Sequence, residues 1–239
     1  MPAAAAQQKA KAVSLSPIPG AMAAIVVVPG QYYAQYLDGG AEHIKPISPA
    51  TAHAILRNED IDTGWLSPGV VRCAETMKGP MVLSYRPPSK ATILLDSGRS
   101  GKPDELTVPL PGLVMIGVDT KYYLWGVQGD NFQPNAVLFN APLPNINTDA
   151  SICFGSNKVG RASGQSMAKI WELFWASPFS DHAVQGKSQK NLKDIRPVLR
   201  ELAKGRGKNK YPPFDLVRFN HGTTVGRAWE SIVNHGKVY

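Results

Sequence analysis

The chain has 239 residues, with 26 basic and 18 acidic side chains and a formal net charge of +8. This length suits one domain with extensions or two small domains, and 43% hydrophobic residues can form a buried core. Its 22 glycines and 20 prolines favour a turn-rich fold over a helical bundle. The two cysteines, Cys73 and Cys153, are too few for a disulfide-rich scaffold or a zinc site built from thiolates.

The chain contains no apolar run long enough to cross a membrane. Its longest such run, residues 21–28, is far shorter than the roughly 20 residues of a spanning helix. Pro17 and Pro19 interrupt the stretch that follows Lys9, so a secretory signal is not expected either. We therefore expect a cytoplasmic protein without membrane contact.

The first part of the chain predicts a disordered arm followed by a small β/α extension. Residues 1–20 are mainly Ala, Gln, Lys, Ser and Pro and have no apolar periodicity, which is typical of disorder. The extension is expected over residues 21–80. It should contain strands at 23–28 and 31–37, a helix from Ser48 to about Asn58, and an irregular stretch over 59–80.

A core of α+β class is expected over residues 81–186. Alternating and β-branched runs without intervening helices predict an antiparallel meander of about four strands. We predict that strands 81–85 and 91–95 form one hairpin, and that strands 113–118 and 122–127 form another. A last short strand is predicted at 137–139.

Helices are predicted after the strands. Residues 166–176 place large apolar side chains at spacings of three and four, which indicates an amphipathic helix. The basic C-terminal region, residues 187–239, should hold two more helices, over 191–203, cut by Pro197, and over 223–234, with Gly236 as its stop.

The residues that could carry chemistry lie between these elements. Cys153 follows turn residues in a loop, so it is either a nucleophile or, as most free cysteines are, a small buried side chain. His182 follows the amphipathic helix, next to Asp181, and histidine is suited to proton transfer near neutral pH. Composition and spacing alone leave the catalytic and the structural interpretation of both residues open.

Three blocks in order along the chain resemble ubiquitin-conjugating enzymes. The segment before Cys153 is similar to that family's active-site segment, in which an Asn lies eight residues before the catalytic Cys, as Asn145 does here. The flanking blocks are Phe132-Gln133-Pro134-Asn135-Ala136-Val137-Leu138-Phe139 and Ser177-Pro178-Phe179-Ser180-Asp181-His182. The chain looks most like the divergent bacterial branch, prokaryotic ubiquitin-conjugating family D, whose members include a protein of the plasmid-borne PRTRC system. That branch is described as lacking the histidine before Pro-Asn, where this chain has Leu143, and as having one after the cysteine.

This resemblance implies a thioester carrier in a bacterial ubiquitin-like conjugation pathway. Cys153 would accept the modifier, Asn145 would stabilise the oxyanion, and His182 would accept the proton of the incoming amine. Asp181 would hold the His182 ring or help to deprotonate an incoming lysine. The implied partners are a ThiF-like adenylating activating enzyme, a ubiquitin-like modifier and a metalloprotease encoded nearby. No metal or nucleotide site is expected in this chain, since it lacks a phosphate-binding glycine loop.

Two other functions remain open at this point. Asn145, Cys153 and His182 are the residue types of a Cys-His-Asn protease, although their order along the chain differs from the papain-like order. Residues 187–210 hold nine basic and two acidic side chains, so an inactive scaffold that binds nucleic acid or an acidic protein there is the alternative function. Cys73 lies in a segment rich in Gly and Pro and is expected to be structural.

Overall fold

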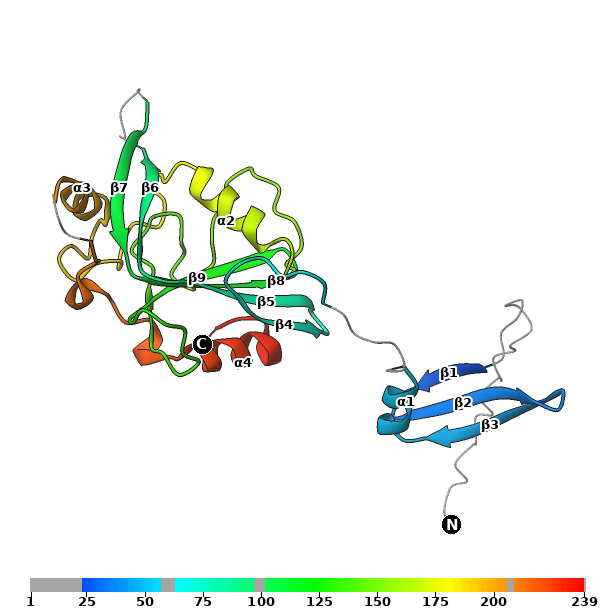
Figure 1. Cartoon of the computed structure of the whole chain (residues 1–239). Helices are drawn as coiled ribbons and strands as arrows, with labels where there is room; N and C mark the ends of the chain where they lie inside the picture. The colour runs from blue at the N-terminus through cyan, green and yellow to red at the C-terminus, as the bar shows by residue number, and fades with distance from the viewer. Residues whose placement is uncertain (1–22, 57–62, 97–101, 206–208, 239) are drawn as a thin grey trace, which may run out of the picture. The chain divides into compact units, whose positions relative to one another are not determined.

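A computed structural model describes residues 23–56, 63–96, 102–205 and 209–238. The chain divides into two compact units, residues 1–62 and 63–239, which we describe separately (Figure 1). The disordered arm expected over residues 1–20 lies outside the described residues.

The first unit is a small antiparallel sheet with one helix. Strands β1 (Ala23–Val28), β2 (Gln31–Asp38) and β3 (Ala41–Ile47) pair in the order β1-β2-β3. Helix α1 (Pro49–Leu56) follows, and the hydroxyl of Ser48 accepts the amide hydrogen of Thr51 at 3.0 Å, as its predicted capping role requires. The first two strands and the helix start were predicted, whereas β3 was not.

The second unit is built on a five-stranded antiparallel sheet of order β10-β9-β8-β5-β4. Its strands are β4 (Val70–Thr76), β5 (Gly79–Arg86), β8 (Gly112–Val118), β9 (Lys121–Val127) and β10 (Leu138–Asn140). The mixed α/β class with antiparallel sheets is confirmed. This sheet has five strands and is not a simple meander, because β5 pairs with β8 and not with the strand that follows it along the chain. Residues 59–80 are not irregular throughout, because β4 pairs with β5, and residues 70–80 are therefore part of this sheet.

The predicted hairpin of residues 81–85 with 91–95 is wrong. Strand β5 pairs with β4 and β8, while β6 (Ser89–Leu95) turns away and pairs with β7 (Asp104–Leu110) in a separate ribbon. The Pro87-Pro88 corner between β5 and β6 accounts for this, because prolines cannot supply the amide hydrogens that a tight hairpin needs. The β8–β9 hairpin is confirmed, and Asp119 in its turn has a positive φ of 50°.

Both faces of the sheet are buried. Along β8, Leu113 and Met115 belong to one apolar cluster, and Val114 and Ile116 belong to another on the opposite face. Figure 1 shows α2 (Met167–Ala176) over one face and α4 (Val225–His235) over the other. Continuous burial of β8 explains why its sequence is a run of apolar residues without polar alternation.

The helices largely match their predictions. The apolar side of α2 is buried as its spacing indicates, and the Trp171 indole donates a hydrogen bond to the Ser84 hydroxyl at 2.9 Å. Helix α4 has Thr224 as its N-cap and left-handed Gly236 as its C-cap. Helix α3 spans Arg196–Lys204, so Pro197 lies in its first turn and starts the helix where we expected it to cut one. Two short 3-10 helices, Pro213–Asp215 and Asn220–Gly222, lie between α3 and α4.

Candidate active site

The segment that carries Cys153 is held along one edge of β9. Strand β10 pairs with residues 125–127 of β9, and residues 150–152 continue along the same edge. The amide of Leu124 donates to the carbonyl of Ala150 at 2.9 Å, and the amide of Ile152 donates to the carbonyl of Tyr122 at 2.8 Å. Cys153 thus follows a short strand-like segment whose position the central sheet fixes.

Leu143 anchors the loop that leads to this segment. Its side chain is completely buried in the apolar cluster between the sheet and α2, together with Ala141 and Ile146. A histidine at this place would contribute polar contacts, whereas leucine holds the loop by burial alone. Burial of Leu143 therefore fixes the point at which the loop enters the core.

Asn145 joins the cysteine segment to the loop that follows α2. Its backbone carbonyl accepts the amide hydrogen of Cys153 at 2.8 Å, and its own amide donates to the carbonyl of His182 at 2.9 Å. The residue has a φ of 60°, a left-handed conformation that asparagine tolerates better than most residues. The structure therefore brings Asn145, Cys153 and His182 together at adjoining backbone positions.

The side chain of Asn145 is held by the same loop. Its Nδ2 donates to the carbonyl of Pro178 at 3.0 Å, and its Oδ1 accepts from the Ser180 hydroxyl at 2.9 Å and the Ser180 amide at 3.3 Å. One of the two hydrogens on Nδ2 is used by Pro178, so the second is left for another acceptor. Cys153 itself is half-buried.

His182 and Asp181 are both exposed, but their surroundings differ. Nε2 of the His182 ring lies 3.2 Å from Oδ1 of Asn147. The described residues show no hydrogen bond between Asp181 and the His182 ring, so Asp181 does not hold this ring in the structure. The pKa of Arg196 is raised first by its hydrogen bond to Asp194, and the negative charge of Asp181 adds to that effect.

Sequence reasoning missed two residues that hold the site, Asn147 and Ser180. Asn147 contacts the ring of His182, and Ser180 contacts the side chain of Asn145. Both lie inside the blocks that carry the family resemblance, two residues after Asn145 and two residues before His182. Their positions could have been proposed from those blocks, but their contacts depend on how two distant loops meet.

Lys187 is buried near the cysteine segment, although its charge suggested a surface position. Its exposed fraction is only 3%, and burial lowers the pKa of its ammonium group to about 8. The negative charge of Asp149 opposes this lowering, so the two charges attract one another across the site.

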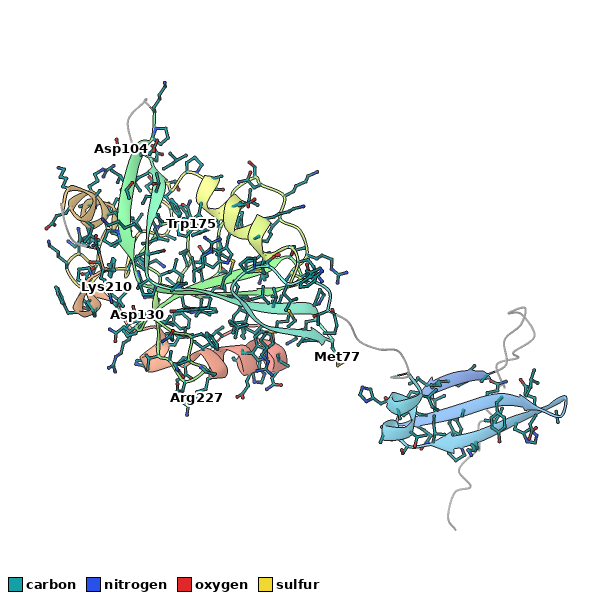
Figure 2. The ribbon with its side chains drawn as sticks, viewed as in Figure 1. Met77, Asp104, Asp130, Trp175, Lys210 and Arg227 are labelled. Carbon is teal, nitrogen blue, oxygen red and sulfur yellow. The ribbon has the colours of Figure 1, made fainter. Side chains whose placement is uncertain are left out.

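Carboxylates pair with four of the nine basic side chains of the segment 187–210. In the described part of the segment the four ion pairs are Lys190–Glu201 at 2.6 Å, Arg196–Asp194 at 2.8 Å, Arg200–Asp104 at 3.1 Å and Lys210–Asp130 at 3.3 Å. Figure 2 shows Lys210 and Asp130 beside one another. Asp104 and Asp130 come from outside the segment, which is why the sequence suggested a larger local positive charge. Lys187 is buried as well, so among the described residues five of the nine basic side chains are either paired with a carboxylate or withdrawn from the surface.

Neither a metal centre nor a membrane helix is found where the structure is described. Within residues 23–56, 63–96, 102–205 and 209–238, no group of three or more His, Cys, Asp and Glu side chains could hold a metal ion. No helix in those same ranges is long and apolar enough to cross a membrane.

Comparison with known proteins points to one family. The family model described as prokaryotic E2 family D matches residues 48–219, well over half of the chain. No curated protein and no solved structure gave a significant match. The matched range contains β4–β10, α2, α3 and the whole site around Cys153, whereas β1–β3 and α4 lie outside it. The extent of this match shows that the chain belongs to prokaryotic E2 family D and is a ubiquitin-conjugating-like protein.

Proposed function

We propose that the protein carries a ubiquitin-like modifier as a thioester on Cys153 and transfers it to an amine. The observation that supports this most directly is the hydrogen-bonded junction at Asn145, whose backbone binds both the amide of Cys153 and the carbonyl of His182. The residues that would supply a nucleophile, an amide donor and a proton acceptor are therefore neighbours through their backbones. Membership of an E2 family adds a ubiquitin-like modifier and an activating enzyme as the general class of partners.

In the first step, the Cys153 thiolate attacks the C-terminal carbonyl carbon of a modifier that an adenylating partner has activated. A C–S bond forms, and the activating group leaves with the electron pair of the bond that it had to the carbonyl. The thioester conserves the energy of activation, so ATP is consumed by the partner.

In the second step, an amine attacks the thioester carbonyl and an oxyanion develops. The second hydrogen on Nδ2 of Asn145 is available to it, and one such donor is typically worth about 100- to 1000-fold in rate. His182 accepts the proton that the amine nitrogen loses. The C–S bond then breaks, Cys153 leaves as a thiolate, and an amide bond remains on the acceptor. The exposed carboxylate of Asp181 attracts the incoming ammonium group.

Cys73 provides a matched control for the experiment that tests this function. It lies in β4, in the same sheet, but partial burial of its thiol raises the pKa of Cys73, and Glu75 raises it further. A less acidic thiol is a weaker source of thiolate near neutral pH. Cys73→Ala should therefore leave any thioester unaffected.

The test is to mix the protein with a candidate activating enzyme, a candidate ubiquitin-like modifier and ATP, and to follow the products by intact-mass spectrometry and on non-reducing gels. We expect an adduct that reductant removes, that persists in Cys73→Ala and that is absent in Cys153→Ala. Cys153→Ser should give an ester that resists reductant. An adduct in Cys153→Ala would disprove the assignment of the nucleophile.

The alternative is an inactive E2-like scaffold that binds a protein or DNA through residues 187–210. The ion pairs of that segment favour a protein partner over nucleic acid, because four of its nine basic side chains are paired with carboxylates and Lys187 is buried. No adduct with partners of demonstrated activity would favour this scaffold.

A further inference from the structure

Four side chains beside the site form a continuous chain of hydrogen bonds that starts at His182. Nε2 of His182 lies 3.2 Å from Oδ1 of Asn147, and Nδ2 of Asn147 lies 2.9 Å from Oγ of Ser151. The Ser151 hydroxyl in turn donates to Oδ1 of Asp149 at 2.6 Å. None of these contacts involves Asn145 or Cys153, so this series of hydrogen bonds is separate from the two residues that are proposed to contact the thioester.

The direction of every bond in this chain follows from its far end. An ionised carboxylate can only accept hydrogen bonds, so the Ser151 hydroxyl must donate its single hydrogen to Asp149. The same hydroxyl can then only accept from Asn147, which fixes the NH₂ group of Asn147 toward Ser151. The carbonyl oxygen of Asn147 therefore faces His182, and Nε2 of the ring must carry the hydrogen that it accepts.

The backbone keeps the chain in place. Oδ1 of Asp149 also accepts the amide hydrogen of Ser151 at 2.9 Å, and the amide of Asn147 donates to the carbonyl of Ser151 at 2.8 Å. The direction of these hydrogen bonds is thus set by Asp149, which lies at the opposite end of the series from His182.

We propose that Asn147 is a positioning residue, which holds the neutral His182 ring with its hydrogen on Nε2 and presents Nδ1 as the proton acceptor. This inference rests on the proposed function, since the accepted proton is that of the attacking amine. When Nδ1 takes that proton, the Nε2 hydrogen stays bonded to the Asn147 carbonyl, whose dipole stabilises the positive ring. Asn147 itself gains and loses no proton.

The first test observes the ring nitrogens of His182 in the free protein by ¹⁵N NMR, and His182→Gln identifies the signals. We expect the neutral wild-type ring to carry its hydrogen on Nε2. The fraction with hydrogen on Nδ1 should rise in Asn147→Leu, which removes the acceptor, and in Ser151→Ala, which frees the Asn147 amide to rotate. Ser156→Ala, an exposed serine in the same loop, serves as the control and should match wild type.

A wild-type ring with its hydrogen on Nδ1 would overturn the inference. So would a ratio of the two neutral forms that is the same in wild type, Asn147→Leu and Ser151→Ala. If Asn147→Leu fails to fold, Ser151→Ala decides alone, because it removes only a hydroxyl.

The second test measures discharge of the loaded protein to free lysine. Asn147→Leu should load normally but discharge about 10- to 100-fold more slowly, and Asn147→Asp, which keeps an acceptor for Nε2, should recover most of that rate. Equal rates in wild type and Asn147→Leu would contradict the positioning role. If no variant loads at all, the proposed function fails, while the NMR result still decides whether Asn147 fixes the ring.

Discussion

Nδ2 of Asn145 donates a hydrogen bond to the carbonyl oxygen of Pro178 at 3.0 Å, so this side chain connects the loops on either side of α2. The same amide group is proposed to bind the oxyanion. A substitution there can affect the structure of the loops as well as the reaction, and the two effects have to be separated by the choice of variant.

Asn145→Gly should load normally and discharge more slowly than wild type, by about 100-fold or more. Glycine tolerates the positive φ of this residue, so the variant removes the amide without straining the backbone. Asn145→Ala removes the same amide but adds strain of about 1 kcal/mol at this φ. Loading and discharge are measured by intact mass, and stability by urea unfolding. Equal loss of loading and discharge in Asn145→Gly would show a purely structural role.

Leu143→Ala should lower the free energy of unfolding by about 2 to 5 kcal/mol, because Leu143 is completely buried where the site loop enters the core. Phe214→Ala is the matched control, since Phe214 is 83% exposed and its truncation should change stability by no more than about 0.5 kcal/mol. Urea unfolding at equilibrium measures both. A small loss in Leu143→Ala would mean that polar contacts, and not burial, hold the loop.

Lys187 should make stability depend on pH in the alkaline range. The pKa of the Lys187 ammonium group is about 8 in the folded protein, against an ordinary value of 10.5. Between these two pH values the unfolded chain therefore binds more protons than the folded protein does. Stability should therefore rise with pH over this window relative to Lys187→Met, by up to about 3 kcal/mol. Below pH 8 the cost of burying the charge is fully present, and Lys187→Met should be the more stable protein.

Urea unfolding at pH 7 and at pH 10 tests this dependence. Lys193→Met is the control, because Lys193 is an exposed lysine on the same segment and should show no comparable change. A difference between wild type and Lys187→Met that stays constant over this range would contradict the burial of the ammonium group.

Ion pairing at residues 187–210 should limit binding to DNA. Glu201→Gln and Asp130→Asn each remove the partner of one lysine. Each should therefore steepen the dependence of log K on log salt by about 0.9 for duplex DNA. Titrations at several salt concentrations by fluorescence anisotropy measure this slope. A wild-type slope that already corresponds to all the basic residues of the segment would show that these ion pairs open on binding.

The parts of the fold that follow from short stretches of chain were predictable. The β8–β9 hairpin has a short turn between two apolar runs, and α2 has large apolar side chains at helical spacing, which is why sequence placed them correctly. The pairing of β5 with β8 was not predictable in the same way, because the β6–β7 ribbon separates the two strands along the chain. Closeness along the chain predicted a hairpin of residues 81–85 with 91–95, whereas the chain turns away at Pro87 and Pro88.

The candidate site, like the fold, was predictable from the sequence only in part. Asn145, Cys153 and His182 were identified from their spacing within the family blocks, and the structure brings them together at one junction. The contact of Asn147 with His182 and the burial of Lys187 depend on where the loop after α2 lies against the cysteine segment. No local pattern encodes that meeting of distant loops.

The family match ends at residue 219, before α4, yet α4 packs its apolar side on one face of the sheet. A shortened protein that stops at that limit would leave Trp125 and Ile116 uncovered, and it should aggregate or unfold. A fragment over residues 63–239 keeps helices on both faces. It is therefore the smallest piece that we expect to fold by itself and to be useful for assays of isolated E2-like chemistry.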